Sequence, residues 1–177
     1  EKLWYTARYI DKEAGVDKTI IDQSIRDIYN RAGELVTRRT DDGTVFVKEE
    51  GKIFFIDDKG ATPGGNKPYI ASFDLGTGKR EVLYRSREGF HETPLGFSGE
   101  GTEKILLASE SPEQVINYYL YDRGKDSLKA LTDYPDPYEG ILNVKKETVR
   151  YTRNDGIPLS GTLYLPGGYD GTEPLPR

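Results

Sequence analysis

The feature that most constrains this fold is a repeated strand–turn–strand pattern. The stretch YIASFDLGTGKREVL (69–83) aligns with NYYLYDRGKDSLKAL (117–131) at an offset of 48 residues, and ARYIDKEAGVDKTI (7–20) aligns with the former at an offset of 63. Each copy has an alternating strand, a turn with Asp and Gly, and a strand ending on an aliphatic residue, which describes a β-hairpin. Sheets repeated at a period in the forties are typical of β-propeller blades. Three unrelated hairpins that share turn chemistry would give a similar alignment.

Three aspartates occupy the same place in the three copies. Asp11 aligns with Asp74, and Asp74 aligns with Asp122. Asp and Gly recur in turns, so these positions predict the turn of each hairpin. The longer offset of the first copy predicts an insertion, which we place in the connection 23–33.

The rest of the chain also carries strand signals. Short runs rich in Val, Ile, Tyr, Phe and Thr are separated by Asp-Gly, Gly-Lys and Pro-Gly turns. These runs predict strands at 3–10, 34–39, 44–48, 52–57, 69–75, 80–86, 104–109 and 116–122. Only 23–30, with Ile25, Ile28 and Tyr29 at helical spacing, favours a helix, of at most one or two turns. The predicted fold class is all-β.

Composition bears on the partners and the compartment. The net charge is only −5, from 25 basic and 30 acidic residues that are interspersed, so no nucleic-acid partner is predicted. No apolar run approaches the roughly 18 residues of a membrane helix, so no membrane partner is predicted either. The absence of cysteine excludes disulfides and thiolate chemistry but leaves the compartment open. Because the chain has no Met, we expect that Glu1 is not the natural start and that a targeting peptide could precede it.

The pattern changes after the last repeat. The stretch LTDYPDPYEG carries Pro135 and Pro137, which cannot continue a central strand, so we expect a linker over 135–146. Beyond it, ETVRYTR and LSGTLYLP flank the turn signal NDGIP, which predicts a new hairpin in the segment 147–177.

These closing residues carry a family resemblance. The run LTDYPDPYEGILNVKKETVRYTRNDGIPLSGTLYLPGGYDGTEPLP resembles the junction between propeller and catalytic domain in the prolyl oligopeptidase family of serine peptidases, most closely its glutamyl-endopeptidase-like branch. Upstream, SIRDIYNRAGELVTRRTDDGT, GATPGGNKP and REGFHETPLGF resemble that branch's propeller. The resemblance implies a partial β-propeller of two to three blades in 1–134, the linker, and then the first hairpin of a truncated α/β-hydrolase domain.

The resemblance also implies where the chemistry lies. The nucleophile, acid and histidine of the family belong to the catalytic domain that follows the propeller, so this chain is expected to lack the triad and to need no cofactor or metal. The implied partners are a peptide substrate and that catalytic domain. The implied function is a non-catalytic part of a serine peptidase that gates substrate access. The alternative is a non-catalytic propeller used as a protein-binding scaffold.

Several local motifs are better explained by structure than by chemistry. The run Gly96 to Glu100 around Ser98 lacks the last glycine of a nucleophile elbow and is interpreted as a loop, and His91 as a polar residue bonded to backbone. The acid pairs 41–42 and 57–58 lack calcium-loop spacing and are interpreted as turns. GTGK (76–79) is interpreted as a hairpin turn, and the tyrosines at 69, 119 and 121 as packing residues.

Four arginines remain candidates for binding substrate. In a propeller-capped peptidase the substrate lies between the propeller and the catalytic domain, and a branch that cuts after acidic residues needs cations there. The candidates, chosen by residue type, are Arg85, Arg87, Arg38 and Arg39. Surface charge is their default interpretation. Because a few blades outside a closed ring expose sheet edges, we also expect self-association through those edges.

Overall fold

The computed structural model describes residues 3–137 and 144–172. All regular elements in these ranges are β-strands, and all their pairings are antiparallel, so the predicted all-β class is confirmed. No helix in the described ranges is long and apolar enough to cross a membrane.

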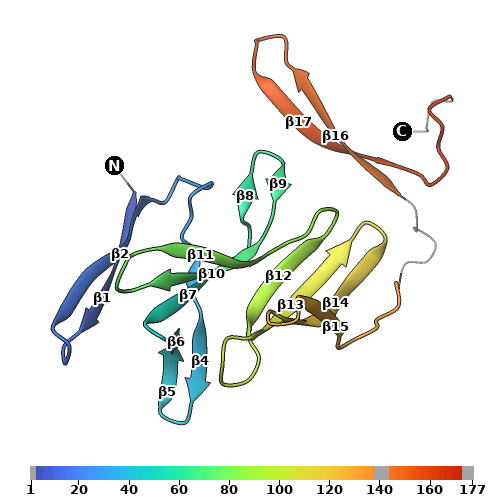
Figure 1. The fold of residues 1–177 in the computed structure, drawn as a ribbon. Helices are drawn as coiled ribbons and strands as arrows, with labels where there is room; N and C mark the ends of the chain where they lie inside the picture. Colours follow the sequence, from blue (N-terminus) through green and yellow to red (C-terminus); the bar gives the residue numbers. More distant parts are fainter. Residues whose placement is uncertain (1–2, 138–143, 173–177) are drawn as a thin grey trace.

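Three units follow one another along the chain (Figure 1). The first hairpin pairs β1 (Trp4–Asp11) with β2 (Val16–Ser24). The five-stranded sheet has the order β11–β10–β7–β3, with β6 also pairing with β7. Its strands are β3 (Glu34–Leu35), β6 (Lys48–Glu49), β7 (Lys52–Asp57), β10 (Tyr69–Asp74) and β11 (Arg80–Arg85). The four-stranded sheet is ordered β12 (His91–Phe97), β13 (Lys104–Ser111), β14 (Gln114–Asp122) and β15 (Ser127–Ala130).

Three further hairpins complete the fold. Two short ones interrupt the five-stranded sheet in sequence, β4 (Thr37–Thr40) with β5 (Gly43–Phe46) and β8 (Ala61–Thr62) with β9 (Gly65–Asn66). The last one, β16 (Lys145–Thr152) with β17 (Pro158–Leu165), lies apart from the two large sheets in Figure 1.

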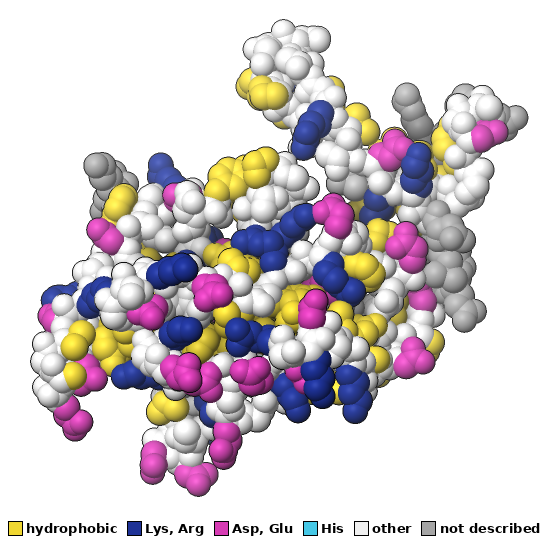
Figure 2. Space-filling model, in the orientation of Figure 1, with side chains coloured by type: hydrophobic (Ala, Val, Ile, Leu, Met, Phe, Trp, Pro, Cys, Tyr) yellow, Lys and Arg dark blue, Asp and Glu magenta, His cyan; other side chains and the backbone are white. Residues whose placement is uncertain are grey.

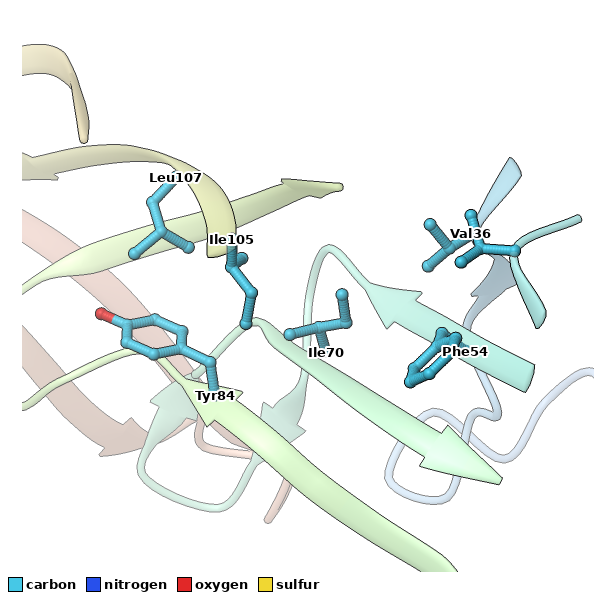
Figure 3. Packing of buried hydrophobic residues seen from close by; sticks show 7 residues of the cluster. Val36, Phe54, Ile70, Tyr84, Ile105 and Leu107 are labelled. Atoms are coloured by element: carbon cyan, nitrogen blue, oxygen red, sulfur yellow. The ribbon is translucent and has the colours of Figure 1, made fainter. Parts of the chain in front are cut away.

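The core forms where the units pack face to face. Successive residues of β7 point to opposite faces of the sheet, so Phe54 and Phe55 enter different clusters. Phe55 packs toward the first hairpin, in a cluster with Ile21. Phe54 belongs to the cluster between the two large sheets, in which Figure 3 shows Val36, Phe54, Ile70 and Tyr84 with Ile105 and Leu107. The strand β7 is therefore buried on both faces.

The repeat corresponds to three equivalent hairpins, β1–β2, β10–β11 and β14–β15. In each, the repeated aspartate accepts a hydrogen bond from the backbone N–H three residues on: Asp11 from Ala14 (3.0 Å), Asp74 from Thr77 (2.7 Å) and Asp122 from Lys125 (3.2 Å). The GTGK segment is the turn after β10, as predicted, because Gly78 N–H donates to the Asp74 carbonyl. The aligned aspartates therefore close the same kind of turn in all three hairpins.

Some predicted elements differ from the structure. The segment 23–30 forms no helix; β2 runs to Ser24 and one turn follows, closed by the bond from Asp27 N–H to the Ser24 carbonyl (3.1 Å). Its Ile25, Ile28 and Tyr29 are all exposed, so nothing stabilises a helical stripe. The predicted single insertion is in fact divided among the connection 25–33 and the hairpins β4–β5 and β8–β9.

Strand boundaries shift at a few points as well. The expected strand 34–39 is split into β3 and β4 at Val36, and the run 91–97, interpreted as lying between repeats, forms β12. The linker prediction falls partly on 138–143, outside the described residues, and β16 begins at Lys145, inside the predicted linker. The expected hairpin around NDGIP is present as β16–β17.

Charges of both signs cover the visible surface. In Figure 2, Lys and Arg side chains lie among Asp and Glu side chains over the stacked sheets, and acidic side chains gather at the tips of the lower hairpins. The face seen there has no continuous stripe of one sign.

Candidate functional site

The four candidate arginines lie in two pairs at opposite ends of β12. Arg38 is in β4, beside Arg39, and its Nη2 donates to the carbonyl of Gly99, just after β12 ends (2.9 Å). Arg85 ends β11, and Arg87 binds Glu92 near the start of β12. A seven-residue strand spans about 23 Å, so the two pairs cannot hold the same small group.

Arg87 forms the most extensive ion pair at this end of the sheets. Its Nε lies 3.0 and 3.2 Å from the two carboxylate oxygens of Glu92, and its Nη2 lies 2.7 Å from Oε1. The backbone N–H of Arg87 also donates to Oε2 (2.9 Å). The guanidinium carbon lies 4.6 Å from the ring centre of Phe90. These contacts fix the guanidinium in one orientation.

Glu92 is the buried centre of this network, with 0% of its side chain exposed. Tyr84 donates its hydroxyl to Oε2 (2.5 Å), and Ser109 donates to Oε1 (3.4 Å). Tyr84 lies in the five-stranded sheet, whereas Glu92 and Ser109 lie in the four-stranded sheet. The carboxylate therefore joins the two sheets at the polar end of their shared apolar core.

The network shifts the proton affinities of its members. Burial raises the pKa of Glu92, but hydrogen bonds from Arg87 and Tyr84 outweigh it, so the pKa lies below its ordinary value. Burial, followed by the bond to Glu92, raises the pKa of Tyr84, and the bond to Glu92 raises the pKa of Arg87. Glu92 is therefore ionised, and Tyr84 and Arg87 keep their protons.

Arg85 is held differently. Its guanidinium lies 4.6 Å from the ring centre of Tyr69, and its Nη1 donates to the carbonyl of Lys67 (3.3 Å). The ammonium of Lys67 forms an ion pair with Glu88. Arg85 thus contacts the backbone of Lys67, and the side chain of Lys67 carries a second positive charge beside Glu88.

A hollow of about 340 Å³ opens where these connections meet. It lies between the β8–β9 hairpin with Lys67, the β11–β12 connection with Arg87 and Glu88, and the end of β13 with Glu110. Such a concave site with convergent polar groups can hold one small polar group of a ligand. Arg38 and Arg39 do not line it.

Two curated plant proteins match almost the whole chain. The chain is 33% identical over 196 residues to the probable chloroplastic glutamyl endopeptidase of Oryza sativa subsp. japonica, covering 98% of this chain and 21% of the relative. It is 34% identical over 176 residues to the protein of the same name from Arabidopsis thaliana, covering 90% of this chain and 18% of the relative. Nearly the whole chain is therefore similar to glutamyl endopeptidases, which are members of the prolyl oligopeptidase family. The chain spans about a fifth of the length of these relatives.

The chain was also compared with family models and with solved structures. No family model matches the chain. Among solved structures, the apo AtxE2 isopeptidase aligns with 78% of this chain and 22% of its own at 18% identity and a TM-score of 0.46. An AtxE2 variant with Astexin3-dC4 bound aligns with 96% of this chain and 31% of its own, at 15% identity and a TM-score of 0.47.

Ser98 and His91 cannot form a nucleophile–base pair. Ser98 lies in the loop after β12, as predicted, whereas His91 begins that strand. The two are separated by the length of β12, far beyond hydrogen-bond reach. The His91 ring contacts the Thr93 hydroxyl (3.4 Å), so its partner is a side chain and not the predicted backbone group.

The other local interpretations agree with the structure. Asp57 accepts a bond from Lys59 N–H (3.1 Å), and the pair 41–42 lies in the turn between β4 and β5. Tyr119 and Tyr121 pack against the core, and Tyr121 lies 4.7 Å from Tyr84 between ring centres. Turn formation and packing therefore account for these residues.

Sequence reasoning missed Glu92, Lys67 and Glu88. Glu92 stands in the run HETPLGF, five residues after Arg87, where its alternation with Pro94 marks an inward position in β12. An acid at an inward strand position needs a partner, and that signal could have identified the pair. Lys67 and Glu88 flank the hairpin β10–β11, so the register of that hairpin was the signal that could have shown their contact.

Proposed function

We propose that this chain is the propeller portion of a serine peptidase, with the first hairpin of the α/β-hydrolase domain at its end. In this proposal residues 1–134 are blades, 135–146 a linker, and 147–177 the start of the peptidase domain. The downstream domain cleaves peptides through an acyl-enzyme. The propeller carries no triad of its own and gates the access of substrate.

The observation that carries the proposal is the alignment with the two glutamyl endopeptidases. It covers 98% of this chain but only 21% of the rice relative, so most of that relative lies outside the match. The face-to-face stack of antiparallel sheets also supports blades, because propeller blades are four-stranded sheets arranged around an axis. The hairpin β16–β17, outside the repeat, supports a second domain.

A serine-directed probe tests the proposal. The complete protein that contains this chain is treated with a fluorophosphonate probe, and the labelled peptide is located by mass spectrometry. We expect one labelled serine C-terminal to Arg177, and no label on a sample limited to residues 1–177. A complete protein that takes up no label, or labelling within 1–177, would overturn the proposal.

The proposal gives the candidate arginines a role on the substrate side. All four would contact acidic side chains of the peptide. Arg85 and Arg87 would act at one end of the sheets, and Arg38 and Arg39 at the other end. Changing each arginine to Met in the complete protein should raise KM for acidic peptides more than for neutral ones. Equal KM changes for both peptides would remove that role.

The chain alone is also proposed to associate with itself through its exposed sheet edges. The strands β11 and β15 each end a sheet and offer unpaired backbone groups on one side. Sedimentation at several concentrations tests this idea. A concentration-independent monomer would contradict it.

A further inference from the structure

The segment that follows β15 stays against the four-stranded sheet although its side chains are not buried. The last regular pair of the sheet joins Tyr119 to Ala130. Beyond it, the Leu131 N–H still donates to the Tyr118 carbonyl (2.8 Å). Leu131 and Tyr134 are 49% and 55% exposed, so burial of apolar side chains does not hold this segment in place. Polar contacts therefore have to hold it.

Asn117 in β14 supplies most of these contacts. It is buried, and its Oδ1 accepts bonds from the Thr132 hydroxyl (2.7 Å) and from the Tyr134 N–H (2.7 Å). Its Nδ2 donates to the carbonyls of Tyr134 (3.3 Å) and Val115 (3.4 Å). An amide side chain has two acceptor lone pairs and two N–H donors, so the hydrogen-bonding capacity of Asn117 is filled.

Thr132 completes the arrangement from the neighbouring segment. Its Oγ1 accepts a bond from the Tyr118 N–H (2.9 Å), while its own hydroxyl donates to Asn117. The two side chains thus replace the backbone partners that a regular strand would offer at 132–134. We call Asn117 and Thr132 the exit clamp. Pro135 follows directly and has no N–H to donate, so a strand ladder cannot continue through it.

The preceding hairpin shows what the exit clamp replaces. Ser86 stands 48 residues before Tyr134, which is the offset of the repeat, and its N–H donates to the backbone carbonyl of Pro68 (2.9 Å). From there the chain passes into β12 of the next stacked sheet. After Tyr134 the chain passes instead to β16, which pairs with β17 in a separate two-stranded sheet. The exit clamp therefore holds the chain where it leaves the stacked sheets.

We propose that the exit clamp is a positioning device, which fixes the residues through Tyr134 to the four-stranded sheet. The hairpin β16–β17 can then change its placement relative to the sheets only through the residues that follow Tyr134. Asn117 and Thr132 act through the segment 131–134 and contact no substrate in this role. Without the clamp, that segment joins the free connection, and the hairpin reaches a wider range of positions.

Spin-label distances on the chain of residues 1–177 test the fixation. Because the chain has no cysteine, Lys104→Cys with Asp133→Cys creates the two labelling sites. Double electron–electron resonance should give a narrow distance distribution for this pair, and Asn117→Ala should widen it to roughly 10 Å, the span of a short free chain. Labelled chain is diluted with unlabelled chain, so that distances within one molecule are measured. A distribution that is already broad with Asn117 in place, or that stays narrow in Asn117→Ala, would overturn the proposal.

Amide hydrogen exchange measures the same release residue by residue. In Asn117→Ala the Tyr134 N–H loses its acceptor and should exchange about tenfold faster. The Lys125 N–H, which bonds to Asp122 in the turn of the same hairpin, should keep its rate. Asn30→Ala is the matched control, because the Asn30 amide bonds to Asp27 in an exposed connection outside the sheet. Equal acceleration at Tyr134 and Lys125 would reduce the effect to a general loosening of the sheet and sink the proposal.

Two variants at Thr132 keep the proposal testable if Asn117→Ala does not fold. Thr132→Val removes the hydroxyl at nearly constant volume, whereas Thr132→Ser keeps it. The Tyr134 N–H bonds to Asn117 and not to Thr132, yet in Thr132→Val it should exchange about threefold faster, because Asn117 loses the partner that orients it. Thr132→Ser should match the parent. Equal Tyr134 rates in the two variants would contradict a clamp made of both residues.

These measurements need no peptidase activity. A failure of serine labelling therefore leaves the exit clamp intact, and a loose segment 131–134 leaves the peptidase proposal intact.

Discussion

The interface between the two large sheets and the hairpin β16–β17 are built from the same kind of sequence but meet different surroundings. Both have antiparallel strands in which successive side chains point to opposite faces. At the interface Leu107 is fully buried, whereas Leu163 in β17 remains 43% exposed. The two-residue period of a strand therefore predicts which side chains share a face, but only the neighbouring element decides whether that face is covered. The variants below sharpen this contrast, from the largest expected effect to the smallest.

Leu107→Ala should cause the largest loss of stability. Leu107 lies in the cluster between the sheets, and truncation leaves a cavity that the flanking strands cannot fill. We expect the free energy of unfolding to fall by about 3 to 4 kcal/mol, measured by urea denaturation. A loss below about 1 kcal/mol would mean that the two sheets are not packed against each other in solution.

Glu92→Gln should be nearly as harmful at the polar end of the same interface. The variant leaves Arg87 without its buried partner and turns one acceptor oxygen into a donor facing Tyr84 or Arg87. We expect a loss of about 2 to 3 kcal/mol. The control is Glu147→Gln in the hairpin, where the exposed pair with Lys145 should contribute less than about 0.5 kcal/mol. Equal losses in the two variants would contradict a special role for the buried pair.

The same carboxylate predicts how stability depends on pH. The pKa of Glu92 is lower in the folded chain than its ordinary value of 4.5, so its contribution is complete above that value. It is lost as the pH falls through the lower, folded pKa, because the unfolded chain takes up the proton first. Thermal midpoints between pH 7 and pH 3 should therefore converge for the parent and Glu92→Gln. Parallel curves would show that Glu92 is not the group responsible.

How far the sequence predicts this molecule depends on whether a feature is local. The hairpin turns could be predicted, because Asp74 and Asp122 each bond within four residues. The strand β12 was missed because Pro94 and Gly96 weaken its strand signal and its bulge lies between them. The hollow could not be predicted from the sequence, for another reason. Lys67 and Glu88 flank the hairpin β10–β11 and meet through its register, but the hollow also needs Glu110 of β13, which the packing of the second sheet brings near.

Two glycines allow the sheets and the hairpin β16–β17 to be compared through the backbone as well. Gly60 has a φ of +51°, and a Cβ there would lie 1.9 Å from the carbonyl oxygen of Lys67, whereas Gly156 has a φ of +84° and open space around it. Gly60→Ala should therefore cost about 2 kcal/mol or more, and Gly156→Ala only the strain of a positive φ, about 1 kcal/mol. Urea midpoints of the two variants provide the comparison. A reversed order would mean that the β8–β9 segment near Lys67 relaxes without cost.

Leu163→Ala should have the smallest effect and is the most informative about the hairpin. It is the same substitution as in Leu107, on a face shared with Val149, Tyr151 and Leu159 that no other element covers in the described ranges. A side chain that is already exposed loses little burial on truncation, so we expect less than about 0.5 kcal/mol. A loss above about 1 kcal/mol that grows with protein concentration would show that a second copy covers this face. The same loss at every concentration would instead mean that the hairpin folds back onto its own sheets.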